Sequence, residues 1–329
     1  MRARARTDPR WGCDPRARPI RQHIEYGIVV LDKPPGPTSH QVAAWAREAL
    51  GVDRVGHAGT LDPKVTGVLV LGISSATRAL DLVREAGKVY MTELVLHRDV
   101  DRARLEEALR AFTGDILQTP PKRSAVRRRL RTRKVYALEL LEFKPKERGR
   151  EALVRAEVES GTYIRTLCHD LGQALGTGAH MGDLRRTSLG PFKEAECVTM
   201  HELRDAAEWF REGGDETELR RVVRPVEDIL AGLPAVTVRD TAVDAMCHGA
   251  PLAVAGVLEA DTTVAVGRNV AILTGKGEGV GVGVAQMTAE QMVEASEGIA
   301  ARPGRVLMAQ GTYPRSWGKG AVEKAEPAE

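Results

Sequence analysis

The amino-acid sequence predicts two domains, an α/β domain followed by a small β-rich domain. The length of 329 residues exceeds that of a typical single domain. Hydrophobic residues make up 43% and charged residues 28%, which is typical of a globular protein and excludes global disorder. Strand and helix patterns alternate up to residue 212, and at Leu233-Pro234 the composition changes to short runs of Val, Ala and Gly. No apolar run approaches 18 residues, so we expect no transmembrane helix.

The first element is a buried strand at residues 27–33 (GIVVLDK), which ends at the proline-rich turn PPGP. Thr38 then caps a helix, and Gln41 three residues later completes a capping box. The following patterns predict a glycine-rich loop, a strand, a helix and a strand at 51–64, 65–73, 76–86 and 88–96.

The second half of the α/β domain begins with a helix that Asp101 caps and Gly114 ends. Strands at 134–144 and 151–159 follow, and apolar residues alternate along the second, so its sheet has one packed face. We then expect a helix, a strand and a helix at 164–172, 181–188 and 199–212. Residues 235–311 form the β-rich domain, and 312–329 form a frayed tail.

Positive charge is concentrated in two segments, although the net charge is only +3. Residues 2–21 contain seven Arg against two Asp, and we expect a mobile tail that can touch RNA. The basic segment at residues 122–134 (KRSAVRRRLRTRK) contains eight Lys or Arg and no acid. It lies in a connection inside a domain, where like charges repel unless a polyanion binds, so it predicts contact with nucleic acid.

The four cysteines are Cys13, Cys168, Cys197 and Cys247. They are far apart and none belongs to a CxxC pair, which argues against a disulfide framework and fits a reducing cytosol. Each of the last three lies near a His, but no two sets have the spacing of a known zinc module, so we predict no metal site.

Three stretches contain candidate functional residues. In GHAGTLDPKVTG (56–67), a glycine-rich loop can present Asp62 to a cleft, although most Asp-Pro steps are ordinary turns. In SGTYIRTL (160–167), Arg165 lies in the first turn of a helix, where a plain surface Arg is the alternative. In KVY (88–90), strand alternation sends Lys88 and Tyr90 to one face, where a half-buried structural Tyr is the alternative.

Together these stretches resemble the ordered motifs of the TruB-type pseudouridine synthases, from LDKPPGPTSH through GHAGTLDPKVTG and KVY to SGTYIRTLCHDLG. The segment TPPKRSAVRRRLRTRKVY is similar to the archaeal and eukaryotic branch, the dyskerin-like catalytic subunit of H/ACA ribonucleoproteins. Residues 235–311 resemble a PUA domain. The resemblance implies four parts: a basic extension (1–24), a catalytic domain (25–234), a PUA domain (235–311) and a tail (312–329). It also implies that the catalytic domain is built around a mixed, mainly antiparallel sheet.

The resemblance implies that this chain is an isomerase that detaches uracil from its ribose and rejoins it through carbon 5, with no cofactor. Asp62 matches the essential family Asp, which either adds covalently or removes a sugar proton. Arg165 matches the Arg that pairs with this Asp, and Tyr90 matches the Tyr that stacks on the target base. Lys33 and Lys88 are implied to contact phosphate or to position a loop, and His57 to contact RNA or to support the loop. Leu189 is implied to contact the flipped base, and Arg127, Arg128 and Arg129 of the basic segment are implied to grip the substrate RNA.

The implied substrates are the T-loop of tRNA, ribosomal RNA, or both. In the guide-dependent branch the enzyme works in the cytoplasm with an H/ACA guide RNA and three small core proteins, and it has no membrane partner. The charge of 235–311, five Lys or Arg against eight Asp or Glu, gives no independent sign of RNA binding. The alternative is a noncatalytic RNA-binding scaffold, which would have no need to keep Asp62, Tyr90 and Arg165.

Overall fold

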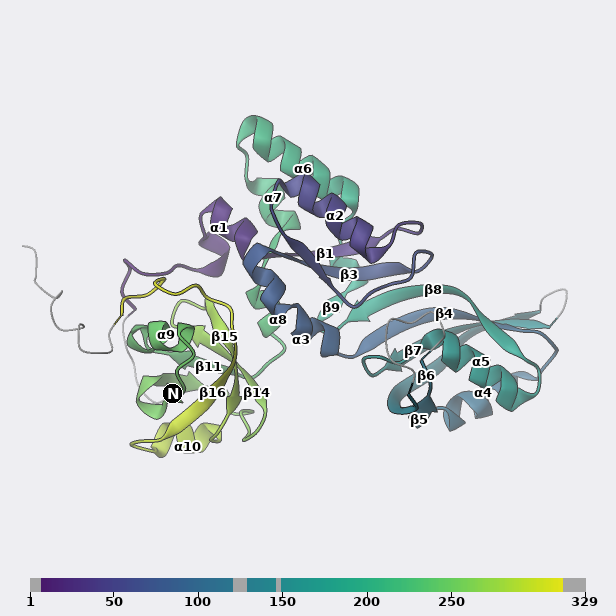
Figure 1. Ribbon diagram of the computed structural model, residues 1–329. Helices are drawn as coiled ribbons and strands as arrows, with labels where there is room; N and C mark the ends of the chain where they lie inside the picture. Colours follow the sequence, from purple (N-terminus) through teal and green to yellow (C-terminus); the bar gives the residue numbers. More distant parts are fainter. Residues whose placement is uncertain (1–6, 121–128, 146–148, 316–329) are drawn as a thin grey trace, which may run out of the picture.

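The computed structural model describes residues 7–120, 129–145 and 149–315 and contains two sheets (Figure 1). Within this described part, the first sheet has ten strands in the order β10-β1-β3-β8-β4-β7-β6-β5, with β2 beside β3 and β9 beside β8. These strands are β1 (Gly27–Lys33), β2 (Val55–Ala58), β3 (Thr66–Ile73), β4 (Lys88–Leu96), β5 (Gly114–Gln118), β6 (Arg131–Pro145), β7 (Arg150–Val158), β8 (Ala179–Leu189), β9 (Phe192–Lys193) and β10 (Arg224–Pro225).

The first sheet is mixed and mainly antiparallel, which confirms the expected architecture. Its one parallel pairing among the described strands joins β3 to β8, where Thr66 and Gly67 lie beside Arg185 and Arg186. The helices of this domain are α1 (Ile20–Glu25), α2 (Ser39–Leu50), α3 (Leu80–Glu85), α4 (Arg102–Ala111), α5 (Ile164–Leu175), α6 (Met200–Gly213), α7 (Thr217–Val222) and α8 (Glu227–Leu230).

Strand β1 explains how the helices cover the sheet, because it is buried on both faces. Val29 and Leu31 pack with apolar residues of α2 and α6, whereas Ile28 and Val30 pack toward α3 and α8. Farther along the sheet, α4 and α5 cover one face of β4, β7 and β6 (Figure 1). Successive strand residues point to opposite faces, so an unbroken apolar run such as GIVVL requires this cover on both sides.

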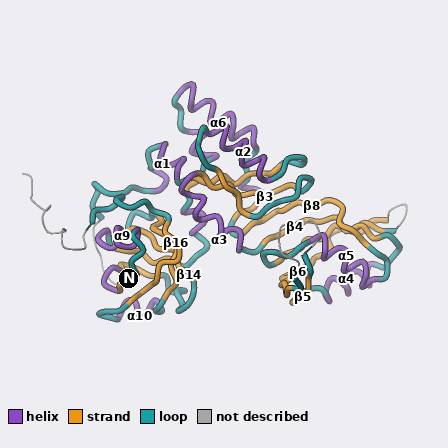
Figure 2. Tube along the Cα trace, in the orientation of Figure 1, coloured by secondary structure: helices purple, strands orange, loops and turns teal. Residues whose placement is uncertain are grey.

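The second sheet has the order β12-β16-β15-β14-β11-β13 and is accompanied by two helices (Figure 2). Its elements are β11 (Ala235–Val238), α9 (Asp240–Cys247), β12 (Leu252–Ala253), β13 (Val257–Ala260), β14 (Asn269–Thr274), β15 (Gly279–Ala285), α10 (Ala289–Glu294) and β16 (Ile299–Val306). Ala271, Val282 and Leu307 of this region share one apolar cluster with β1 and β3, so the two domains pack against each other.

Four local features differ from the sequence predictions. The loop expected at 51–64 contains β2, which is only four residues long and has few residues of the types that favour strands. The short strand β5 follows Gly114, where only the end of a helix was expected. The helix expected at 76–86 begins as a 3₁₀ turn at Ser74–Ala79 and becomes α-helical at α3. The expected tail at 312–329 is wrong at Tyr313, which is buried and donates to Glu278.

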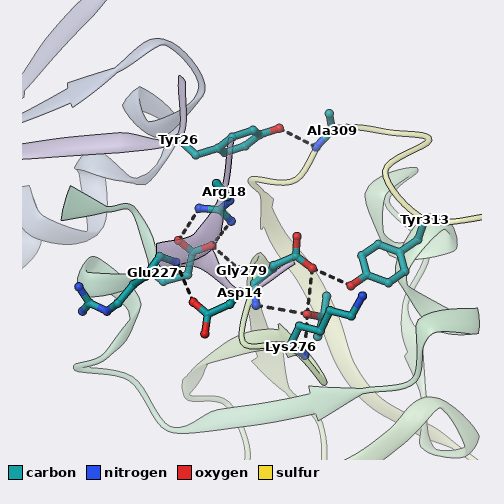
Figure 3. A network of polar contacts seen from close by, with 11 residues as sticks. Asp14, Arg18, Tyr26, Glu227, Lys276, Gly279, Ala309 and Tyr313 are labelled. Atoms are coloured by element: carbon teal, nitrogen blue, oxygen red, sulfur yellow. Dashed lines mark hydrogen bonds and ion pairs between the residues drawn. The ribbon is translucent and has the colours of Figure 1, made fainter. Parts of the chain in front are cut away.

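The N-terminal segment 7–26 is packed against both domains, so the expected mobile tail is wrong for its described residues. Trp11 packs against the core of the β-rich domain, and Lys276 donates to the carbonyls of Asp8, Trp11 and Gly12. Figure 3 shows the network of polar contacts around Arg18. Arg18 donates twice to Glu227 of α8, at 2.9 and 2.6 Å, and Glu227 also accepts from the backbone of Gly279.

The Arg18–Glu227 pair therefore joins three parts of the chain, and its side chains are only 6% and 12% exposed. Substitution of Arg18 by Ala leaves the buried Glu227 carboxylate without its cation, and breaking such a pair costs about 3–5 kcal/mol. We expect Arg18→Ala to lower the melting temperature by several degrees in a thermal unfolding measurement. The control is Arg10→Ala, because Arg10 pairs with Asp8 on the surface, with its side chain 79% exposed. Equal melting temperatures for the two variants would contradict this role.

None of the helices in the described ranges is both long enough and apolar enough to cross a membrane.

Candidate active site

Asp62 lies in the loop between β2 and β3, and the residues on either side of it are fixed. Ser39, the first residue of α2, is fully buried. Its hydroxyl accepts a hydrogen bond from the Leu61 amide at 2.9 Å and donates to the Leu61 carbonyl at 3.2 Å. A single side chain thus satisfies both the amide and the carbonyl of the residue before Asp62. In a tight loop these two backbone groups have no partner from regular secondary structure.

Lys33 fixes the other side of this loop. It is fully buried, and its Nζ donates to the carbonyls of Pro34, Pro63 and Val65 at 2.8, 3.0 and 2.9 Å. Burial lowers the pKa of Lys33, while the charge of Asp62 acts in the opposite direction. Of the two roles expected for Lys33, phosphate contact or loop positioning, the structure supports the second, because all three protons of its ammonium are used to hold the loop.

Arg186 of β8 supports the start of the loop and was missed in the sequence. It is 1% exposed, and its guanidinium donates to the carbonyls of Gly59 and Val68 at 2.8 Å each. Gly67, with φ of +101°, lies so close that a Cβ there would be 2.1 Å from the Arg186 carbonyl oxygen. The only sequence signal is a second Arg after Arg185 in a strand, which does not distinguish a buried side chain from an exposed one.

Arg165 reaches the same loop from α5 and forms an ion pair with Asp62. The start of α5 is held by the buried Gln118 at the end of β5, whose amide accepts from the Tyr163 amide and donates to its carbonyl. The side chains of Asp62 and Arg165 are 57% and 51% exposed. An ion pair this exposed adds about 0–1 kcal/mol to stability. Its effect is to fix the direction of a carboxylate that a substrate can still reach.

Tyr90 lies on β4 between Ala156 of β7 and Arg186 of β8. It is 8% exposed and shares an apolar cluster with Leu61 and Ile164, the residues that precede Asp62 and Arg165. Asp62 and Arg165 are thus paired, and Tyr90 belongs to the apolar cluster that contains the residue before each of them. Lys88 and Tyr90 both point to the buried face of β4, as the alternation predicted.

Lys88 and Leu189 lie opposite each other on β4 and β8. Lys88 is 6% exposed, and its Nζ donates to the carbonyls of Arg84 and Ala86. Leu189 is fully buried in the cluster that also contains Ile28 and Phe192, so its predicted contact with the target base is wrong. Leu184 of the same strand is only partly buried and packs against the cluster of Tyr90, which makes it the better-placed apolar residue.

The remaining predicted residues lie outside this group. The ring of His57, on β2, packs edge-on against His40 with a centroid distance of 4.7 Å. Burial, His40, Arg84 and Arg186 lower the pKa of His57 to about 4, so it is neutral at physiological pH. Arg129 is exposed in the connection that precedes β6, at the hairpin with β5. Arg127 and Arg128 lie outside the described residues.

The arrangement can perform chemistry that needs one reachable, oriented carboxylate beside an aromatic ring. The carboxylate can attack or remove a proton, the guanidinium can hold its direction, and the phenol ring can stack on a planar base.

Burial together with the positive charge of Arg186 lowers the pKa of Lys88 from 10.5 to about 8. Below pH 8 this Lys is charged in both states, so the cost of burying the charge is fully present. Between pH 8 and 10.5 the unfolded state binds more protons, so the free energy of unfolding should rise with pH. We expect urea unfolding to show this rise in the wild type and a smaller rise in Lys88→Met. The same pH dependence in both proteins would contradict the assignment.

Four family models match successive parts of the chain. Residues 1–43 match the DKCLD domain, and 47–164 match the N-terminal domain of TruB family pseudouridylate synthases. Residues 165–231 match the C-terminal domain of tRNA pseudouridylate synthase B, and 234–307 match the PUA domain. Two similar curated proteins are both described as probable tRNA pseudouridine synthase B. The one from Methanopyrus kandleri is 51% identical over 96% of this chain and 93% of its own length. The one from Methanosarcina mazei is 51% identical over 95% and 91%.

Two solved structures are similar over nearly the whole chain. One is described as a Cbf5-Nop10-Gar1 complex; its matching chain is 47% identical, with a TM-score of 0.87 over 94% of both chains. The other is described as an H/ACA RNP bound to a substrate RNA that contains 2'-deoxyuridine. Its matching chain is 44% identical, with a TM-score of 0.86 over 95% of both chains. The chain thus belongs to the TruB family of pseudouridine synthases, in the dyskerin-like branch that carries a PUA domain.

Proposed function

We propose that this pseudouridine synthase isomerises uridine in tRNA, in ribosomal RNA or in both, with Asp62, Tyr90 and Arg165 as its catalytic residues. The observation that carries the proposal is the exposed Asp62–Arg165 ion pair on a loop held by buried side chains. An exposed ion pair contributes little to stability, so its position is better explained by a role in catalysis than by a role in folding.

The reaction breaks the bond between N1 of uracil and C1′ of the ribose, and it forms a bond between C5 and C1′. The proton on C5 leaves to solvent, and N1 regains a proton, so the atoms balance without an oxidant, a nucleotide or a metal. Asp62 either adds to the substrate or removes a sugar proton, and both routes require a free carboxylate. Tyr90 stacks on the base that has been taken out of its helix, a contact worth about 1–3 kcal/mol.

The similar proteins support two kinds of RNA substrate. The curated relatives are named as tRNA enzymes, and the similar structures are H/ACA assemblies with Nop10, Gar1 and substrate RNA. We propose that this chain also works with an H/ACA guide RNA and three small core proteins in the cytoplasm. Its proposed parts are an extension (1–24), a catalytic domain (25–234), a PUA domain (235–311) that holds the guide, and a tail (312–329).

A noncatalytic scaffold is the alternative function. It would need the fold and the packing between domains, but not an exposed carboxylate paired with an Arg beside a buried Tyr. The assembly of these three residues from β4, α5 and the Asp62 loop favours the enzyme.

The catalytic assignment is tested by tritium release from RNA labelled at carbon 5 of uridine. We expect Asp62→Asn to lose at least a thousandfold in rate, because the amide can neither attack nor accept the proton. RNA binding should survive, since the variant keeps the size of the side chain. The assay starts with protein and a tRNA transcript. If the wild-type protein releases no tritium, guide RNA and partner proteins are added. Pseudouridine formed by Asp62→Asn at the wild-type rate would refute the assignment.

The basic segment is tested by replacing Arg127, Arg128 and Arg129 with Gln. Each lost phosphate contact should lower the slope of log binding constant against log salt by about 0.7–0.9. The measurement is a salt titration of RNA binding. A slope equal to that of the wild type would remove the segment from the interface.

A further inference from the structure

A pocket lies between α2, β2 and α3, and Gly59 and Thr60 of the Asp62 loop contribute to its lining. It has a volume of about 610 Å³. Its lining is mainly polar and cationic and includes His40, Arg47, Arg54, His57, Thr60 and Arg84. We propose that this pocket binds a phosphodiester of the RNA strand that flanks the target uridine, an inference that rests on the proposed function.

The charge of the lining favours an anion. Three arginines (Arg47, Arg54 and Arg84), two histidines and two threonines line the pocket, and the lining contains no Asp or Glu. Arg84 pairs with Asp81, which lies outside the lining. In the described part of the chain, no ion pair holds Arg47 or Arg54, and both residues are exposed. Guanidinium groups bind phosphate oxygens with two parallel hydrogen bonds, so a phosphate is the natural ligand of this set.

A second observation concerns His57, one of the two histidines in the lining. The Nδ1 atom of His57 is buried and has no hydrogen-bond partner in the structure. A buried polar atom without a partner costs about 1–3 kcal/mol, so such atoms are normally satisfied by protein, water or ligand. The neighbours that lower the pKa of His57, namely His40, Arg84 and Arg186, are themselves cationic or protonatable. A bound phosphate would relieve this accumulation of like charge.

The position of the pocket favours RNA over a free anion. Gly59 and Thr60 line it, and Thr60 precedes Asp62 by two residues, which places their backbones at most about 7 Å apart. A strand whose target uridine reaches Asp62 must therefore pass within a nucleotide or two of the pocket. Phosphate contacts of this kind fix the register of a nucleic acid without reading its sequence.

The test compares two double variants with equal loss of charge. Arg47→Gln/Arg54→Gln changes the pocket, whereas Arg98→Gln/Arg204→Gln changes two exposed arginines that do not line it. Binding of the RNA substrate is measured from low to high salt. We expect the pocket variant to lower the salt slope by about 1.4, or 0.7 for each single-stranded phosphate contact, and the control to leave it nearly unchanged. Equal slopes for the two variants would overturn the proposal.

A second measurement uses the wild-type protein and does not depend on how the variants fold. Nitrogen-15 NMR of the histidine rings, with and without a uridine-containing RNA oligonucleotide, should show the pKa of His57 rising when RNA binds. An unchanged pKa would also overturn the proposal. Tritium release by the same wild-type preparation distinguishes failure of the pocket proposal from failure of the proposed function. If the wild type releases tritium but the two double variants have equal salt slopes, only the pocket proposal is refuted. No release, even with guide RNA and partner proteins, refutes the proposed function.

Discussion

The loop that carries Asp62 is held by two buried cations that bind backbone carbonyls instead of carboxylates. Lys33 binds the carbonyls of Pro63 and Val65, and Arg186 binds those of Gly59 and Val68. Burying a charge costs several kcal/mol unless its hydrogen bonds are satisfied. Here the carbonyl dipoles satisfy it, and among the described residues Asp62 is the one carboxylate that pairs with Arg165. The loop can therefore be rigid while the carboxylate itself stays half exposed.

This constraint determines what lies around the loop. Arg186 reaches both ends of the loop because β3 and β8 run in parallel at Gly67, where any side chain would collide with the Arg186 backbone. The same strand places Tyr90 beside Arg186 across the β4–β8 pairing. On the other flank, Gln118 at the end of β5 fixes the first turn of α5. The hairpin that carries the basic segment and the helix that carries Arg165 are thus mechanically linked.

Most of the fold could be predicted from the sequence because it depends on local patterns, whereas the roles of Asp62, Tyr90 and Arg165 came from the resemblance to a known family. The capping box of Thr38 and Gln41 and the alternation of Lys88 and Tyr90 are confirmed, since each needs only a few neighbouring residues. The failures concern contacts between distant segments. Whether a cation is buried depends on which carbonyls surround it, so the sequence left both phosphate contact and loop positioning open for Lys33. Leu184 and Leu189 lie on the same strand and differ in the apolar cluster against which each packs, which the sequence does not indicate. Nothing near the N-terminal arginines in the sequence indicates that Arg18 pairs with Glu227.

Buried hydrogen bonds, and not the ion pair alone, position Asp62. The most direct test is the single-turnover rate of Arg186→Lys at saturating RNA, with thermal unfolding to check that the variant is folded. Lys keeps the charge but cannot reproduce the fork that reaches Gly59 and Val68 together. We expect at least a tenfold lower rate with RNA binding retained. A folded variant that reacts at the wild-type rate would contradict it.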